Sequence, residues 1–222
     1  MVRKVATVKY SERTLEKKKN KSGKEGEAKI KALLNQLPKE YIVINNLILD
    51  TTVLKQGKLS KLKKSGKESS TQIDHLVISP YGIFVIETKN HTGVITGNPG
   101  DMQWYQGKYD GTKDPFYNPY YQNIRHIDNL YKLLDIDRSY FTGIIVFSND
   151  KADLSELPCS IAIDKDDLLP LILSYTKRVI SSTDVFDLFS YIESIRLTGQ
   201  KGEQRHKKFI SRLKSNQQIV ST

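Results

Sequence analysis

The sequence predicts an α/β fold in which a mixed central sheet is flanked by helices. Residues 72–89 contain two apolar strands that meet at Pro80-Tyr81, as expected of a β-hairpin. Residues 22–37 and 119–134 carry apolar side chains at helical spacing. Residues 141–147 are a continuous apolar run, which is typical of a central strand.

The chain has 222 residues, enough for one α/β domain with a substantial core, and a second full domain is not expected. We expect the domain at residues 22–198, between a lysine-rich arm at 1–21, loose or helical, and a basic tail at 199–222. The single cysteine, Cys159, excludes an intrachain disulfide framework and indicates a reducing compartment. It opens an apolar strand, so we expect its side chain to pack.

The first predicted helix has an apolar stripe formed by Ile30, Leu33, Leu34 and Leu37. Gly23 and Gly26 project onto this stripe, where a missing side chain lets the helix approach another backbone closely. Glu27 lies on its edge and is expected to point toward the sheet. Alternatively, Ser22 is the N-cap of the helix, Glu25 completes a capping box, and Glu27 only favours the helix dipole.

The predicted hairpin brings polar side chains together at its open end. A two-residue loop places Asp74 opposite Glu87 and Gln72 opposite Lys89, all four on one face of the strands. Facing carboxylates repel each other, and Mg²⁺ or Mn²⁺ bridging Asp74 and Glu87 is the most economical compensation. The alternative is a structural salt-bridge cluster, and a one-residue bulge would move Asp74 to the other face.

The remaining elements follow from shorter patterns. We expect strands at 41–49 and 159–163, short strands and turns at 93–111, and helices near 165–175 and 183–197.

Positive charge is concentrated in the segment before the Asp74 strand, and the chain carries a net charge of +10. Six lysines without an acidic residue occur there: Lys55, Lys58, Lys61, Lys63, Lys64 and Lys67. Such a segment favours phosphate backbones through counterion release. The alternative is a solvated insertion, and overall basicity would also suit an anionic membrane surface or simple solubility.

An aromatic segment follows the hairpin, formed by Trp104, Tyr105, Tyr109, Phe116, Tyr117, Tyr120 and Tyr121. We favour the interpretation that these side chains cover the edge of a sheet, and the alternative is stacking on unpaired bases. His75 is expected to face away from Asp74 and to be structural. His126 lies on the predicted helix near Gln122, without an evident partner.

Four motifs in order resemble a known family: Gly23 to Glu27, Gln72 to Asp74, Gly82 to Lys89, and Asn118 to Gln122. Over about residues 22–135 the chain is similar to the NERD, or nuclease-related, domain, a branch of the PD-(D/E)xK nuclease superfamily.

This resemblance implies a restriction-endonuclease-like core, with Asp74 and Glu87 as metal ligands and Lys89 as the catalytic lysine. Glu27 and Gln122 would be auxiliary site residues. One departure is Ile73, which stands where a proline often precedes the aspartate.

These observations together predict a metal-dependent nuclease that hydrolyses phosphodiester bonds, with DNA as the expected substrate and Mg²⁺ or Mn²⁺ as cofactor. One alternative is a non-catalytic nucleic-acid-binding module on the same scaffold. Another is a protein-interaction domain whose acidic cluster is structural. No apolar stretch approaches the roughly 20 residues that span a bilayer and no secretory core follows Met1, so a cytoplasmic location is expected.

Overall fold

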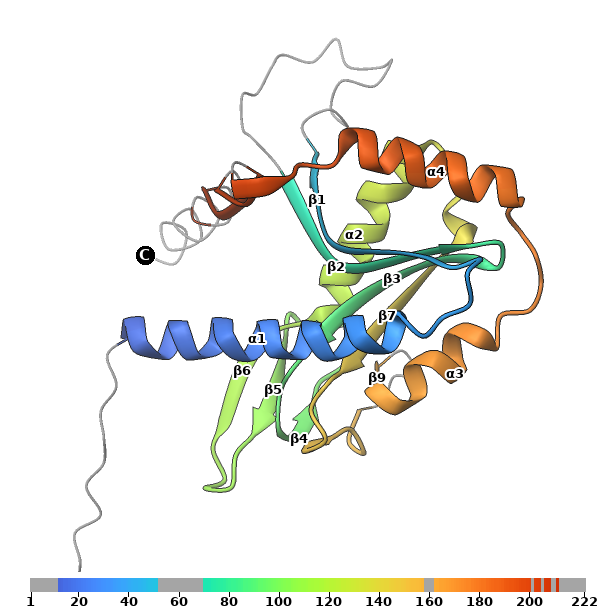
Figure 1. Ribbon diagram of the computed structural model, residues 1–222. Helices are drawn as coiled ribbons and strands as arrows, with labels where there is room; N and C mark the ends of the chain where they lie inside the picture. Colours follow the sequence, from blue (N-terminus) through green and yellow to red (C-terminus); the bar gives the residue numbers. More distant parts are fainter. Residues whose placement is uncertain are drawn as a thin grey trace, which may run out of the picture.

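The computed structural model describes residues 12–51, 70–157 and 162–200, together with 202–204, 206–208 and 211. The central sheet is formed by β1 (Ile42–Asp50), β2 (Ser70–Ser79), β3 (Gly82–Lys89), β7 (Phe141–Phe147) and β9 (Ala162–Asp164). Its strand order is β1-β2-β3-β7-β9 (Figure 1). The first three strands pair antiparallel, whereas β7 pairs parallel with both β3 and β9. This mixed sheet confirms the predicted fold class and the central position of residues 141–147.

Helices cover both faces of the sheet (Figure 1). They are α1 (Glu12–Leu34), α2 (Pro119–Leu134), α3 (Leu168–Leu173) and α4 (Ser182–Ile195), with 3-10 turns η2 (Arg138–Tyr140) and η3 (Lys165–Asp167). Leu76 and Ile83 pack with residues of α2 and α4, whereas Val77 and Phe84 pack with residues of α1 and α3. Successive residues of β2 and β3 therefore face opposite layers, as the strand period requires.

Helix α1 differs from its predicted bounds. It begins at Glu12, so residues 12–21 of the predicted arm are helical and Ser22 lies inside the helix. The alternative capping box of Ser22 and Glu25 is therefore wrong. The reason is that Lys and Glu, which dominate residues 12–21, are good helix formers, so the helix extends toward the N-terminus past Ser22. The predicted apolar stripe is confirmed at Ile30 and Leu34, which are fully buried.

A second, smaller sheet lies beside the end of the central one. It contains β4 (Gly93–Thr96), β5 (Gln103–Gly107), β6 (Lys113–Tyr117) and β8 (Ala152–Asp153), in the order β6-β5-β4-β8. Trp104 is fully buried and packs with Ile95, Ile145 and Phe147. This confirms the sheet-covering interpretation for Trp104, whereas Tyr109 in the β5–β6 turn is fully exposed.

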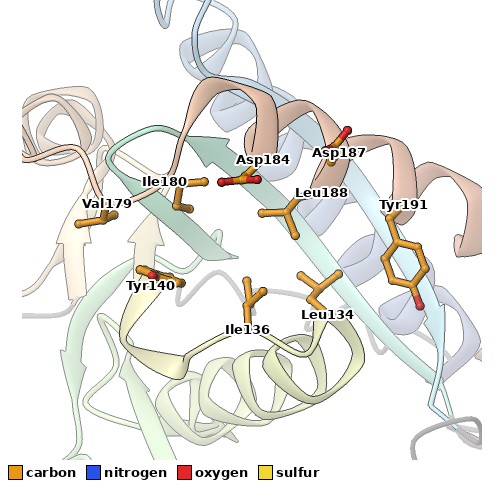
Figure 2. A pocket seen from close by; sticks show the side chains of 9 residues that line it. All are labelled: Leu134, Ile136, Tyr140, Val179, Ile180, Asp184, Asp187, Leu188 and Tyr191. Atoms are coloured by element: carbon orange, nitrogen blue, oxygen red, sulfur yellow. The ribbon is translucent and has the colours of Figure 1, made fainter.

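A cavity lies between the C-terminal end of α2 and α4 (Figure 2). It has a volume of about 460 Å³, and Leu134, Ile136, Ile180 and Leu188 are among the residues that line it. None of the described helices is both long and apolar enough to cross a membrane. The predicted lysine segment at 55–67 and Cys159 fall outside the described residues.

Candidate functional site

The predicted site lies where β2 and β3 stop pairing. The two strands follow the predicted register from Ser79–Gly82 to His75–Ile86, and their ladder ends there. Beyond it, the Thr88 backbone N–H donates to Asp74 Oδ2 at 2.9 Å. The Asp74 carboxylate is thus directed at the end of β3, where Glu87 and Lys89 lie.

The predicted strand face is interrupted next to Asp74. Ile73 and Leu76 share one core cluster although they are three residues apart, so side-chain alternation changes phase between them. Asn46, which lies opposite this point on β1, has a φ of 52°. The predicted pairings of Asp74 with Glu87 and of Gln72 with Lys89 both lie beyond the end of this ladder. The Gln72 amide donates to Asn46 Oδ1 at 2.8 Å.

Helix α2 brings further polar groups to this point. The Asn123 amide donates to Val85 O at 2.9 Å and to Ile144 O at 3.0 Å, which fixes α2 across β3 and β7. Gln122 Oε1 accepts from Lys89 Nζ at 3.2 Å. Gln122 is therefore brought to the site, as the motif resemblance implied.

The start of α2 is held by Asn118, which is fully buried. Its side-chain oxygen accepts from the Tyr120 backbone N–H at 2.8 Å, as an N-cap, and Pro119 occupies the first helical position. Its amide donates to the carbonyls of Asn98, Pro99 and Asp101 at 3.2, 3.2 and 2.6 Å. The Asn-Pro pair of the motif thus joins α2 to the loop between β4 and β5.

Glu87 is buried with its charge compensated by the protein. Its side chain is 3% exposed, and Oε1 accepts from Lys89 Nζ at 2.5 Å. On the other side, His126 Nε2 lies 3.5 Å from Glu87 Oε2. Burial acts to raise the pKa of Glu87, but Lys89 and His126 together hold that pKa below its usual range. The carboxylate is therefore ionised at neutral pH, as a cation ligand must be.

Asp74 and Glu27 behave in the opposite way. Burial, followed by the nearby Glu87 charge, raises the pKa of Asp74 well above its usual value, although the Thr88 N–H opposes this. Burial and Glu87 also raise the pKa of Glu27. The charges of Asp74, Glu87 and Glu27, on β2, β3 and α1, therefore repel one another, and a cation among them would relieve this repulsion.

Helix α1 reaches the site by crossing the C-terminal ends of β3 and β7. A Cβ on Gly26 would lie 2.6 Å from Ser148 Oγ and 2.8 Å from Asn90 Cβ, so a larger residue would force one of these neighbours to move. The Asn90 amide also donates to Ser22 O at 2.7 Å. Gly23 has no neighbour within 4 Å of such a Cβ, so the predicted close approach is confirmed for Gly26 and wrong for Gly23.

The donor set suits a hard divalent cation. Asp74 and Glu87 offer carboxylate oxygens, and Mg²⁺ is typically held by one or two carboxylates with waters and substrate phosphates. Glu87 Oε2 is buried and makes no hydrogen bond. Within the described ranges, no group of three or more His, Cys, Asp or Glu is arranged to hold a metal ion. A cation here would accordingly depend on water or substrate oxygens for its remaining ligands.

The two histidines of the sequence analysis have different surroundings. His75 is buried, its Nδ1 lies 2.6 Å from Asn45 Oδ1, and burial lowers its pKa to about 4, which fits the predicted structural role. His126, by contrast, contacts Glu87, and this neighbour was missed. Its spacing of four residues from Gln122 was the available signal, because such residues share one helix face.

The apolar cavity of Figure 2 contains none of the predicted site residues. It begins at Leu134, eight residues after His126 on α2, which corresponds to roughly 12 Å along the helix axis. The polar cluster at the end of β3 is therefore a separate feature of the fold.

Comparison with known proteins identifies a relative and a family. The chain is 29% identical over 193 residues to an uncharacterised protein of Bacillus anthracis, covering 85% of this chain and 83% of that protein. No solved structure gives a significant match. Residues 22–148 match the nuclease-related domain, and this segment contains Glu27, Asp74, Glu87, Lys89 and Gln122. The chain therefore belongs to the nuclease-related domain (NERD) family, a branch of the PD-(D/E)xK nuclease superfamily.

Proposed function

We propose that this protein is a metal-dependent nuclease that hydrolyses phosphodiester bonds, with DNA as its substrate. The observation that carries the proposal is the convergence of Asp74, Glu87 and Lys89 at one end of the sheet, with Lys89 Nζ bonded to both Glu87 and Gln122. This arrangement is expected for cleavage of a phosphodiester within the family to which the chain belongs.

In this proposal Asp74 and Glu87 hold Mg²⁺ or Mn²⁺ through their carboxylate oxygens. The chemistry that such an ion supplies when bound is polarisation of the scissile phosphate and activation of a water. Burial, followed by the Glu87 charge, raises the pKa of Asp74, and a cation bound beside the two carboxylates would offset this by favouring the ionised form of Asp74.

Lys89 is assigned to the substrate. Its side chain is 17% exposed, so the ammonium is shielded but reachable from solvent. Gln122 Oε1, at 3.2 Å, offers it a second, uncharged partner and can retain the ammonium when Glu87 is otherwise engaged. From that position Lys89 stabilises negative charge that develops on the phosphate. Glu27, which is half-buried on α1, is assigned to holding water on the α1 side of the site.

DNA as the substrate is supported by the net charge of +10. We also assign the lysine segment at 55–67 to the phosphate backbone. Replacing Lys61, Lys63 and Lys64 with Ser is expected to flatten the slope of log affinity against log salt by about 0.7–0.9 for each lost phosphate contact. Fluorescence anisotropy with labelled DNA at several salt concentrations measures this slope. An unchanged slope would remove the segment from the binding surface.

The proposal is tested by incubating the purified protein with plasmid DNA and Mg²⁺ or Mn²⁺. We expect cleavage that EDTA abolishes and that the Glu87→Gln variant lacks. The outcome that contradicts it is DNA binding without cleavage, by wild type and variant alike, with either metal. That result would favour the non-catalytic nucleic-acid-binding module, and absence of binding as well would favour a protein-interaction domain.

A further inference from the structure

The His126 imidazole connects three elements of the fold. From α2, its Nδ1 lies 2.7 Å from Thr71 Oγ1 on β2, and its Nε2 lies 3.5 Å from Glu87 Oε2 on β3. All three side chains are nearly or fully buried. Thr71 therefore holds the ring at Nδ1, and Nε2 points at the Glu87 carboxylate.

The carboxylate determines which nitrogen of the ring carries hydrogen. An oxygen of the ionised Glu87 only accepts, so the favourable state places a proton on Nε2 of His126. A neutral ring then has a free lone pair on Nδ1, and the Thr71 hydroxyl donates to it. Thr71 thus satisfies Nδ1 in the tautomer that directs the Nε2 hydrogen at Glu87.

Lys89 and Gln122 leave Glu87 Oε2 free to interact with His126. Lys89 Nζ binds the other oxygen, Oε1, and Gln122 binds Lys89. Glu87 Oε2 and His126 Nε2 are both buried without a hydrogen bond, and they face each other at 3.5 Å. A shift of a few tenths of an ångström would bring them to hydrogen-bond distance.

We propose that His126, held by Thr71, is a positioning residue that fixes the orientation of the Glu87 carboxylate toward Lys89 and toward the cation that the proposed site would hold. This inference rests on the proposed function. It adds a residue that acts through Glu87 without touching the substrate. Partners of this kind orient ligating carboxylates, and their loss typically lowers metal affinity or activity about 10–100-fold.

Three variants separate positioning from packing. His126→Gln extends an amide N–H about as far as Nε2 and can still reach Glu87. His126→Asn is shorter, so its amide reaches Thr71 but not Glu87. His126→Leu fills similar volume with no donor. We expect Leu and Asn to weaken Mn²⁺ binding about 10–100-fold in calorimetric titration, and Gln to restore most of the affinity. Single-turnover DNA cleavage should follow the same order.

His75→Asn is the matched control, because His75 is also a buried imidazole, its Nδ1 lies 2.6 Å from Asn45 Oδ1, and it shares a strand face with Val77, which packs in the α1 layer. We expect it to lower the melting temperature and to leave Mn²⁺ affinity unchanged.

Two results overturn the inference alone: wild-type Mn²⁺ affinity in His126→Leu, or rescue by Asn and not by Gln, which would assign the ring to packing against Thr71. If wild-type protein binds no Mn²⁺, the proposed function fails together with this inference. The two failures are therefore distinguishable.

Discussion

Two glycines of α1 that lie three residues apart should respond oppositely to the same substitution. In a helix interior, alanine is more favourable than glycine by about 0.8–1.0 kcal/mol. Gly23→Ala should stabilise the protein by about that amount, because a Cβ there meets nothing within 4 Å. Gly26→Ala gains the same propensity, but its Cβ would lie 2.6 Å from Ser148 Oγ and 2.8 Å from Asn90 Cβ.

The cost at Gly26 follows from what the new methyl group meets. The hydroxyl of Ser148 can rotate away, whereas Cβ of Asn90 moves only with its backbone. Overpacking of this kind typically costs about 1–3 kcal/mol, so Gly26→Ala should be neutral to about 2 kcal/mol less stable than wild type. The two variants should differ by about 1–3 kcal/mol.

Urea unfolding of the two variants and the wild type measures this difference. For a chain of this length, each kcal/mol also shifts the melting temperature by about 2–4 °C. Equal stabilisation by both substitutions would refute the close approach of α1 to β3 and β7, because the clash would then be absent.

The remaining predictions concern single charges. Asp74→Asn should abolish tight Mn²⁺ binding in calorimetry, yet melt at the same or a higher temperature in EDTA at pH 7. The reason is that the fold raises the pKa of Asp74, so the ionised side chain destabilises the folded state at any pH above the ordinary Asp pKa. The gain in melting temperature should therefore vanish near pH 4. Undiminished Mn²⁺ affinity in the variant would contradict the shared cation site. Lys89→Ala should retain DNA binding in Ca²⁺ but slow single-turnover cleavage by about 10²–10³, and a wild-type rate would remove Lys89 from the chemistry. Burial lowers the pKa of His75 to about 4, so the folded state resists its protonation, and the free energy of unfolding should fall by about 2 kcal/mol at pH 5 through this group. Urea unfolding at pH 7 and pH 5 measures this loss, which should be smaller in His75→Asn.

Where the local sequence shows both the apolar pattern of an element and the residues that end it, the predicted bounds agree with the observed ones. Residues 82–89, 119–134 and 141–147 form β3, α2 and β7 as expected, because each has a continuous or helical apolar pattern bounded by turn or capping residues. The start of α1 was missed because its polar N-terminal residues give no signal of where the helix begins.

The sequence predicted most members of the candidate site, except His126, but only part of its contacts. The hairpin pattern predicted that Asp74, Glu87 and Lys89 lie together, and the motif resemblance added Gln122. The contact of Gln122 with Lys89 depends on the packing of α2 across β3 and β7, which only the assembled sheet provides. The phase change at Asp74 depends on Asn46 of another strand. Such non-local effects leave no periodic signal in the sequence.

The buried Asn118 limits where the chain can change in length. Its amide is satisfied by three carbonyls of residues 98–101, so one inserted residue there would misalign them and rotate the first turn of α2, which carries Gln122. In the β5–β6 turn, by contrast, the backbone N–H hydrogen bonds of Lys108, Gly111 and Thr112 stay within the turn, and Tyr109 is fully exposed. Homologues should therefore vary in length at the β5–β6 turn and keep the loop before β5 constant, and the exposed turn is the suitable place to graft a tag or a second domain.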